Sequence, residues 1–531
     1  MNLRRSIVEI KHGLKLAVAA FVLVTSQTVV HAEPVKGGTL RLLVSSEPAS
    51  LSLGFASGSQ ITINTKIREG LLVYDLDLKP QPSLATSWSV SPDGKTFTFK
   101  LREGVQWHDG QPFKAEDVVF TLNYFKAVRN NILVNYVGSE ATDNHTVTVT
   151  FSEPAPYLLT LLGPSQLPIL PAHAYKGLDT DAIRKSDVLI GTGPFVFKEW
   201  ERASHVTLER NPNYWDKPKP YLDRIVFPFI PDSAGRTLAL ETGEVDLGSE
   251  TPVARNDIAR LKKIPGLEFD TRGYERNPLV IHLGFNLDNP KLADLRVRQA
   301  IAHVVDKQRI LDTAWYGQGT LTDSFVPPDQ RDFYEKNVTA YPYNIEEANR
   351  LLDEAGFKRD ANGVRFSLGY VHFPGESLKK LGDILKSELT KVGIDLTVKT
   401  QDQAGFFKSV WGDNSFDIYG HSNNAQADPA ISIPRGFLST AIEPGVTFSN
   451  ATKYRNAEVD RLLKAGASEP DLQKRIKDYS DFQKIVSKEI PIYPILVQQN
   501  FTIASKNVKD HTVNAEGVAK GSLADTWLAA E

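Results

Sequence analysis

Hydrophobic and polar residues alternate in several short segments of the first half of the chain. Thr96–Leu101 (TFTFKL) and Thr146–Phe151 (TVTVTF) show the period of two that predicts strands with one buried face. Residues 39–44 (TLRLLV) form a compact apolar run after two glycines and predict a first strand. Further strands are predicted at residues 195–197, 205–208 and 224–229. The first half is therefore predicted to be rich in strands.

The second half alternates helical and strand-like segments. Asn344, followed three residues later by Glu347, resembles a capping box, and Gly356 lies where the helix would end. Apolar residues spaced along one helical face predict the other helices. The predicted helices span residues 292–305, 344–356, 377–392 and 472–487, and the predicted strands span 394–398 and 491–503. This succession implies two α/β lobes and allows the chain to return to the first lobe at its end.

Composition narrows the function without defining it. The 531 residues suggest two or three domains. With 61 Lys and Arg against 64 Asp and Glu, the formal net charge of −3 gives no electrostatic reason to bind nucleic acid. The absence of cysteine excludes disulfides, thiolate nucleophiles and cysteine-ligated metal sites.

The N-terminus is built like a secretory signal peptide. Four basic residues precede the apolar segment 16–24, and small residues are available for cleavage after Ala32. The apolar segment is about half of the roughly 20 residues that span a bilayer, so a membrane anchor is the less favoured alternative. Elsewhere no apolar run reaches that length. We therefore expect residues 1–32 to be removed and the protein to be periplasmic and not membrane-embedded.

Motifs of known enzymes are missing from the sequence. It contains no G-x-S-x-G, H-E-x-x-H or P-loop pattern, and residues 191–193 (GTG) lack the third glycine of a dinucleotide loop. His108 and Asp109 are adjacent on an extended chain and would point to opposite faces, and Asp109-Gly110 is a turn signal. The 11 histidines show no metal-ligand clustering. We predict no catalytic residue, metal or cofactor; a carboxylate pair for glycoside hydrolysis is the remote alternative.

Several segments resemble, in the same order, those of a known protein family. Residues 85–123 (ATSWSVSPDGKTFTFKLREGVQWHDGQPFKAEDVVFTLN) are similar to the signature block of the family 5 bacterial solute-binding proteins, which are ABC-importer receptors for oligopeptides, dipeptides, nickel or opines. The other similar segments are residues 37–40 (GGTL), 190–195 (IGTGPF), 210–215 (RNPNYW), 296–310 (RVRQAIAHVVDKQRI), 348–357 and 427–429 (ADP). The resemblance covers essentially the whole chain after residue 32.

The resemblance implies an α/β, two-lobed periplasmic-binding-protein fold, class II-like and of the large peptide-receptor type, with an extra small domain on the first lobe. The implied boundaries are 33–72, 186–283 and 500–531 for the first lobe, 73–185 for the extra domain, and 284–499 for the second lobe. A small-molecule ligand would lie between the lobes and pass to the transmembrane permease of the importer. We expect a monomer.

The segment 421–429 departs from the peptide receptors of the family. Those receptors carry an aspartate, which holds the peptide ammonium, a few residues before an acidic-Pro pair; here Asp428-Pro429 is that pair and Ala425 stands at the expected place. The neighbouring neutral polar groups suit hydroxyl-rich ligands. Arg435-Gly436 would bind a phosphate or carboxylate, or else form a plain surface turn. An opine or sugar-phosphodiester ligand of the agrocinopine type is therefore favoured; a peptide receptor that anchors the amine differently, and a metal carrier, are alternatives.

The predicted ligand-binding residues come from three parts of the chain. Each has core packing or plain surface exposure as its alternative role. They are His421, Ser422, Asn423, Asn424, Gln426, Arg435 and Gly436 in this segment, Ser46 and Glu47 (with Ser45) after the first strand, and Tyr316, His372 and Trp411 (with Asn286) in the second lobe.

Overall fold

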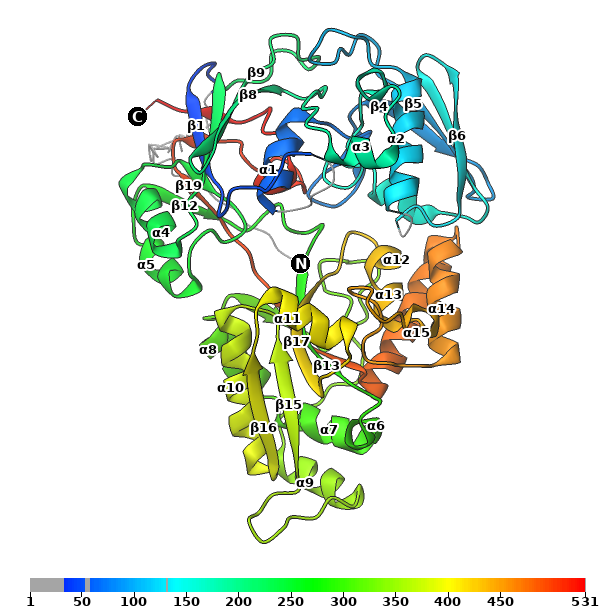
Figure 1. Ribbon diagram of the computed structural model, residues 1–531, viewed down its shortest axis with the longest axis vertical. Helices are drawn as coiled ribbons and strands as arrows, with labels where there is room; N and C mark the ends of the chain where they lie inside the picture. Colours follow the sequence, from blue (N-terminus) through cyan, green and yellow to red (C-terminus); the bar gives the residue numbers. More distant parts are fainter. Residues whose placement is uncertain (1–32, 53–57, 130–131, 531) are drawn as a thin grey trace, which may run out of the picture. The chain divides into compact units, whose positions relative to one another are not determined.

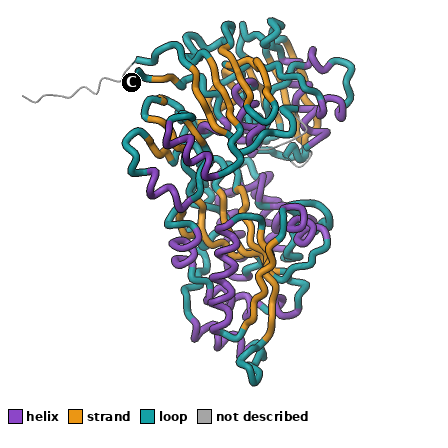
Figure 2. Tube along the Cα trace, turned by 60° about the vertical axis from the view of Figure 1, so that its left-hand side comes forward, coloured by secondary structure: helices purple, strands orange, loops and turns teal. Residues whose placement is uncertain are grey.

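The computed structural model describes residues 33–52, 58–129 and 132–530 (Figure 1). The predicted signal peptide, residues 1–32, lies outside the described residues. Val35–Glu531 forms one compact unit and is described by itself below. Figure 2 shows its strands grouped into separate sheets with helices packed beside them. We call the part built on the seven-stranded sheet the first lobe and the part built on the six-stranded sheet the second lobe.

The first lobe is built around the predicted first strand. In its sheet, of order β12-β19-β11-β1-β10-β9-β8, β1 runs parallel to both of its neighbours. Leu40 and Leu42 of β1 pack with α1, whereas Leu43 packs with α4 on the other face. The first-lobe elements are β1 (Thr39–Leu43), β8 (Phe195–Glu201), β9 (His205–Arg210), β10 (Arg224–Pro228), β11 (Leu247–Gly248), β12 (Leu267–Asp270), β19 (Thr502–Ser505), β20 (Val508–Lys509), β21 (Trp527–Leu528), α1 (Gly58–Ile67), α4 (Ser233–Thr242), α5 (Ile258–Leu261) and α16 (Gly517–Lys520).

A small antiparallel domain interrupts the first lobe. Its four-stranded sheet has the order β4-β5-β7-β6, and the inward residues of the two predicted alternating strands are buried, as expected. Its elements, with the short hairpin before them, are β2 (Leu72–Tyr74), β3 (Pro80–Pro82), β4 (Ala85–Val90), β5 (Thr96–Leu101), β6 (Tyr136–Asp143), β7 (Thr146–Phe151), α2 (Ala115–Val128) and α3 (Thr180–Lys185), with 3-10 turns η1 (Pro156–Thr160) and η2 (Ala172–Tyr175).

Motif residues in this part of the chain have structural contacts. His108 Nε2 lies 3.0 Å from the Gly193 carbonyl oxygen, whereas Asp109 pairs with His173 at 2.8 Å, so the two neighbours do point apart. The GTG segment packs against the end of α1: a Cβ at Gly193 would lie 2.6 Å from the Ile67 carbonyl oxygen, which accepts the Gly193 amide at 2.9 Å. Its glycines therefore allow backbone to meet backbone.

The second lobe is a mixed sheet of order β14-β18-β13-β17-β15-β16. β13 is antiparallel to β17 and β18, and β15 is parallel to β16 and β17. Helices α7 to α10 share a buried core with this sheet, and α14 and α15 pair in a second cluster. The elements are β13 (Leu279–Phe285), β14 (Gly319–Leu321), β15 (Phe366–His372), β16 (Ile394–Thr400), β17 (Ile418–Asn424), β18 (Ile492–Gln498), α6 (Pro290–Ala293), α7 (Leu295–Val304), α8 (Lys307–Ala314), α9 (Ile345–Glu354), α10 (Glu376–Lys391), α11 (Gln403–Phe407), the π-helical turn η4 (Lys408–Gly412), α12 (Pro429–Ser432), α13 (Pro434–Phe437), α14 (Ala457–Ser468) and α15 (Leu472–Glu489).

Two predicted elements of the second half are divided in the structure. The helix predicted at 292–305 is α6 followed by α7, because the Asp294 side chain accepts the Arg296 amide at 2.9 Å and starts a new helix. The strand predicted at 491–503 is β18 and β19, which lie in different sheets. The helix start at Asn344 is as predicted, since its side chain accepts the Glu347 amide at 2.9 Å.

The chain passes between the lobes twice. It leaves β12 of the first sheet for β13 of the second, and it leaves β18 of the second sheet for β19 of the first. All seven residues of β13 pair within the second sheet, so the predicted boundary after residue 283 would cut this strand. Among the helices of the described residues, none has the length and hydrophobicity of a membrane-spanning segment.

Candidate functional site

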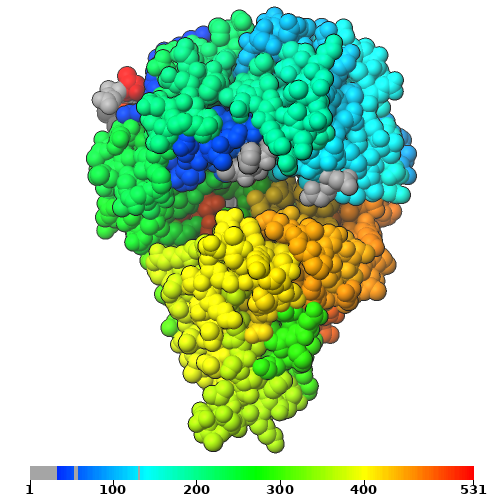
Figure 3. All heavy atoms as spheres, viewed as in Figure 1, coloured from blue at the N-terminus to red at the C-terminus, as the bar shows by residue number. Residues whose placement is uncertain are grey.

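Polar side chains lie at the carboxyl end of β17, at the edge of the second sheet. Residues 418–421 are buried, and Ser422 to Asn424 are half-buried while still paired with Ile281 to Leu279 of β13. This is the carboxyl end of β17 and of its parallel neighbour β15, the edge at which α/β sheets generally hold ligands. Figure 3 shows the yellow and orange surface around α11 to α13 bordering a crevice whose other side is the surface of the first lobe and the small domain.

The amides at this edge are incompletely paired. Asn423 Nδ2 is buried and has no hydrogen-bond partner among the described residues, whereas Asn424 Oδ1 accepts the Gln426 amide at 3.1 Å. Gln426 has a φ of 57°, and its Oε1 accepts Gln166 Nε2 of the small domain at 2.9 Å. Its carbonyl oxygen accepts Gln330 Nε2 at 2.6 Å. The end of β17 therefore offers a free donor and lies directly against the small domain.

Ala425 faces away from this polar edge. It has no exposed surface and packs between Val280 and Val497. Its carbonyl oxygen accepts Gln330 Nε2 at 2.9 Å and Ser432 Oγ at 2.7 Å. The position where peptide receptors carry their aspartate is thus part of a small apolar cluster.

Asp428 is neutralised inside the second lobe. Arg475 Nη2 contacts Asp428 Oδ1 at 2.8 Å and Oδ2 at 2.9 Å, and both side chains are almost fully buried. The same carboxylate accepts the Ala430 amide at the start of α12. Asp428 is therefore not available to a ligand cation.

His421 lies in an aromatic cluster below the polar edge. Its ring stacks on Phe406 at 5.6 Å with an interplanar angle of 11°. Burial, assisted by the positive potential of His282 and Arg435, lowers the pKa of His421 to about 3. The imidazole is therefore neutral near pH 7. The rings around it at 5.2–5.8 Å are those of Phe373, Phe406, Trp411 and Phe448.

Arg435 is a partly buried cation without a counter-ion. Its guanidinium carbon lies 4.9 Å from the centre of the Phe448 ring, and no carboxylate among the described residues pairs with it. Burial lowers the pKa of Arg435, although an arginine stays protonated in proteins. A Cβ added at the next residue, Gly436, would meet nothing within 4 Å, so open space adjoins this turn.

Two predicted residues with large rings lie in the core. His372 is 1% exposed, stacks on Tyr370 at 5.8 Å, and places Nδ1 2.9 Å from the Phe373 carbonyl oxygen. Trp411 is 6% exposed and donates from Nε1 to the Ser449 carbonyl at 3.0 Å. Their direct contact with a ligand stays a prediction; the structure shows Trp411 in the aromatic cluster and His372 beside Tyr370, which belongs to the core between the sheet and its helices.

The Glu47 carboxylate is occupied by the β8–β9 hairpin. It accepts hydrogen bonds from Trp200 Nε1 at 3.0 Å and the Ala203 amide at 3.2 Å, and Arg202 lies 3.5 Å away. These contacts give Glu47 a structural role, and we leave it out of the proposed site.

The remaining predicted residues are dispersed. Ser46 is exposed, with its Oγ 3.3 Å from Ser59 Oγ at the start of α1, and neighbouring Ser45 lines a cavity of about 220 Å³ there. Tyr316 is 41% exposed and accepts a hydrogen bond from Lys380 Nζ at 2.6 Å.

Asn286 lies at the opposite end of the sheet from the polar edge. It follows Phe285, which pairs with Ile418 at the start of β17, whereas Asn424 pairs with Leu279. Asn286 Nδ2 donates to the Phe416 carbonyl at 2.9 Å. The structure therefore does not bring Asn286 and the polar edge together.

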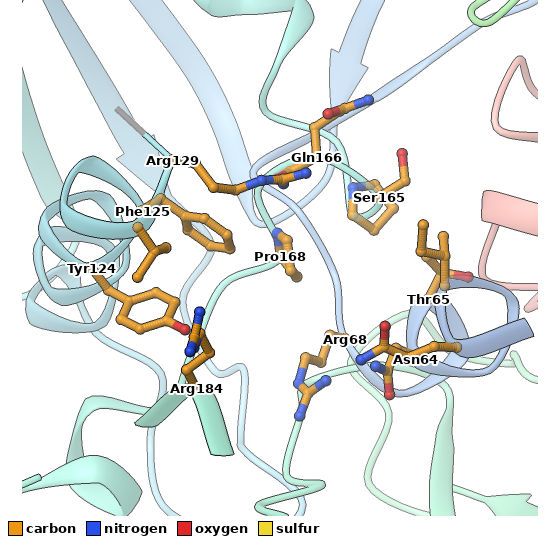
Figure 4. Close-up of a pocket in the computed structure, with 14 residues that line it drawn as sticks. Asn64, Thr65, Arg68, Tyr124, Phe125, Arg129, Ser165, Gln166, Pro168 and Arg184 are labelled. Atoms are coloured by element: carbon orange, nitrogen blue, oxygen red, sulfur yellow. The ribbon is translucent and has the colours of Figure 1, made fainter. Parts of the chain in front are cut away.

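A pocket that the sequence did not reveal lies on the small-domain side. It has a volume of about 230 Å³ and is lined by residues from α1, α2, the segment 164–168 and Arg184 of α3 (Figure 4). Gln166, which holds Gln426, is one of its lining residues. Because four separated segments build it, no local sequence pattern could have indicated it. Within the described part of the chain, no group of three or more His, Asp or Glu side chains is arranged to hold a metal.

Comparison with known proteins identifies the family. The model of the bacterial extracellular solute-binding proteins, family 5, matches residues 79–444, which is more than half of the chain. This chain belongs to that family. The family 5 protein is 28% identical over 466 residues to the heme-binding protein A of Haemophilus influenzae, covering 82% of each chain. It is 27% identical over 470 residues to the di/tripeptide-binding protein 1 of Pseudomonas aeruginosa, covering 83% of this chain and 84% of the other.

Solved structures confirm the fold of the family 5 protein. NikA from Brucella suis, in complex with Fe(III)-EDTA, matches with a TM-score of 0.81 at 24% identity and covers 92% of this chain and 100% of its own. AgaA from A. tumefaciens R10, in complex with agropinic acid, matches with a TM-score of 0.76 at 25% identity over 93% of this chain and 99% of its own. The predicted family and the predicted two-lobed α/β fold are therefore both confirmed, and the protein is a solute-binding receptor.

Proposed function

We propose that this family 5 protein is the periplasmic receptor of an ABC importer for a small polar organic ligand. An opine, a sugar phosphodiester or another sugar conjugate is favoured. The ligand would be held between the lobes and delivered to the permease without chemical change, by a protein that acts as a monomer and not as an enzyme. The observation that carries this proposal is the end of β17, where half-buried neutral amides gather and no free carboxylate is present between residues 421 and 430.

The chemistry of this edge disfavours a peptide ammonium. An ammonium group taken out of water needs an anionic partner, because the cost of desolvating it is several kcal/mol. Ala425 supplies none, and the charge of Asp428 is balanced by Arg475. By contrast, the free Asn423 amide can donate to a sugar hydroxyl or an amide oxygen. AgaA, a structural neighbour solved with agropinic acid, is consistent with this ligand class.

A di- or tripeptide receptor is the second candidate. The similarity to the di/tripeptide-binding protein 1 favours it. In that case Arg435 would meet the peptide carboxylate, and the amine would be held by groups other than those of β17.

Calorimetry against a panel of ligands separates these candidates. The panel contains agropinic acid, a sugar phosphodiester, and unmodified di- and tripeptides. We expect binding of an opine or sugar conjugate, with Arg435→Ala weakening it by about 2–5 kcal/mol because a desolvated ligand anion would lose its partner. Arg455→Ala is the matched control, since Arg455 is exposed in the same lobe. Tight binding of peptides alone would favour the second candidate, and turnover of any ligand would contradict the receptor role.

A further inference from the structure

The charged side chains that line the pocket beside Gln166 are all cationic among the described residues. Among the described residues that line it, the ionisable ones apart from Tyr124 are Arg68, Arg129 and Arg184, and none is an aspartate or glutamate. Figure 4 shows the three arginines approaching from different elements, with Arg129 reaching toward Gln166 and Ser165. Three cations around one cavity repel one another unless an anion enters.

Arg68 is the most buried of the three and has no carboxylate partner among the described residues. It is 1% exposed, and its Nη2 donates to the Val188 carbonyl at 2.6 Å. Besides Val188, its hydrogen-bonding neighbour among the described residues is the Tyr175 hydroxyl, and no carboxylate there pairs with it. Burial lowers the pKa of Arg68, and the nearby Tyr175 hydroxyl partly offsets this effect. A buried guanidinium without an anionic partner is costly in a folded protein, because it gives up its hydration.

Glu69, the residue after Arg68 in the chain, does not pair with the Arg68 guanidinium. The Glu69 carboxylate accepts hydrogen bonds from Tyr214 at 2.8 Å and from Trp215 and Thr192 at 2.9 Å each. The Glu69 carboxylate is therefore bonded to these three side chains and leaves the charge of Arg68 unbalanced.

The other two arginines are also available to a ligand. Arg129 Nη1 donates to the Gln166 carbonyl at 3.2 Å, which leaves the rest of its guanidinium free of ion pairs with described residues. Arg184 is exposed, and its nearest carboxylate, that of Asp181, lies 3.7 Å away with 73% of its side chain exposed. Such a surface pair contributes little and is easily exchanged for a ligand.

We infer that this pocket binds the carboxylate or phosphate group of the transported ligand. The inference rests on the proposed receptor function and assigns one subsite within it. A guanidinium holds either group through two parallel N–H···O bonds, and Asn64, Thr65 and Ser165 add neutral donors to the same wall. Because Gln166 joins the pocket to Gln426, a ligand with its acid here would present its remaining polar groups to the end of β17.

Small anions test the subsite without knowledge of the natural ligand. We would titrate the full protein with sodium phosphate, sodium acetate and acetamide at constant ionic strength and follow the heat of binding. We expect saturable one-to-one binding of phosphate or acetate and none of acetamide. Arg129→Gln and Arg184→Gln should each weaken anion binding roughly tenfold, because each variant loses one charge-assisted hydrogen bond. Arg202→Gln, on the exposed β8–β9 hairpin, is the matched control and should leave it unchanged.

Each result of these titrations either supports the anion subsite or overturns it. Absence of saturable anion binding, or equal affinity in Arg129→Gln, Arg184→Gln and the control, would overturn it. If the ligand panel yields a tight organic ligand that phosphate and acetate do not displace, the subsite is wrong and the receptor function stands. If anions bind as expected but no organic ligand does, the subsite stands and the receptor function is wrong. Phosphate and acetate, titrated separately, show which acid group the pocket prefers.

Discussion

Replacing Ala425 with aspartate restores the acidic residue of peptide receptors at a position that this chain buries. Ala425 has no exposed surface and lies between Val280 and Val497. The new carboxylate would be desolvated without a partner, at a cost of about 3–5 kcal/mol in the free energy of unfolding at pH 7. It would reduce this cost by holding its proton, so its pKa would rise above the ordinary value near 4. We therefore expect Ala425→Asp to be much less destabilising at pH 4 than at pH 7.

Urea unfolding at both pH values measures this effect, and the absence of cysteine keeps disulfide exchange out of the experiment. Ala361→Asp, at an exposed position, is the control and should change stability little at either pH. Calorimetry with dipeptides completes the assay. A variant that is as stable as the control and has gained dipeptide binding would refute the reasoning, because position 425 would then face the ligand.

Three further substitutions probe the surroundings of the site. Asp428→Asn should lower the free energy of unfolding by about 3–5 kcal/mol, since it leaves the buried guanidinium of Arg475 without its anion, and urea unfolding measures it. His282 is buried and its pKa is lowered to about 4, so the folded protein loses stability as the pH falls from about 6.5 to 4. His282→Phe should abolish this loss, which amounts to about 1.4 kcal/mol per pH unit. Gly191→Ala should cost at least about 2 kcal/mol, because its Cβ would overlap the backbone carbonyl of Ile67, and thermal unfolding would reveal it.

Matched controls are available for these variants. Asp395 is exposed, so Asp395→Asn should have little effect on stability. A Cβ at Gly138 would meet nothing within 4 Å, so Gly138→Ala should be tolerated. An unchanged acid sensitivity of the His282 variant would contradict the role given to burial of that histidine.

Local patterns were sufficient to predict many elements from the sequence. The alternation of β5 and β7 and the cap at Asn344 depend on residues a few positions apart, so each is visible in the chain itself. The division of β18 from β19 was not visible in this way. The two strands are predicted as one strand-like segment, and their pairing in different sheets separates them.

Part of the candidate site could also be predicted from a local sequence pattern. The polar residues at the end of β17 are consecutive, so their position at one edge follows from a single strand. The direction of a single side chain was less predictable: Glu47 follows β1 as expected, but the β8–β9 hairpin captures its carboxylate. The arginine pocket requires α1, α2 and α3 to converge, and their distances along the chain give no sign of this.

Native mass spectrometry of the purified protein tests the central claim most directly. If the protein is a receptor that holds a small polar ligand between its lobes, a fraction should carry one organic molecule that is released on denaturation and rebinds, with the same mass, after refolding. Arg435→Ala should carry less of it than wild type. A protein that never retains a small molecule and binds none of the panel, or that returns a molecule of altered mass, would contradict the claim.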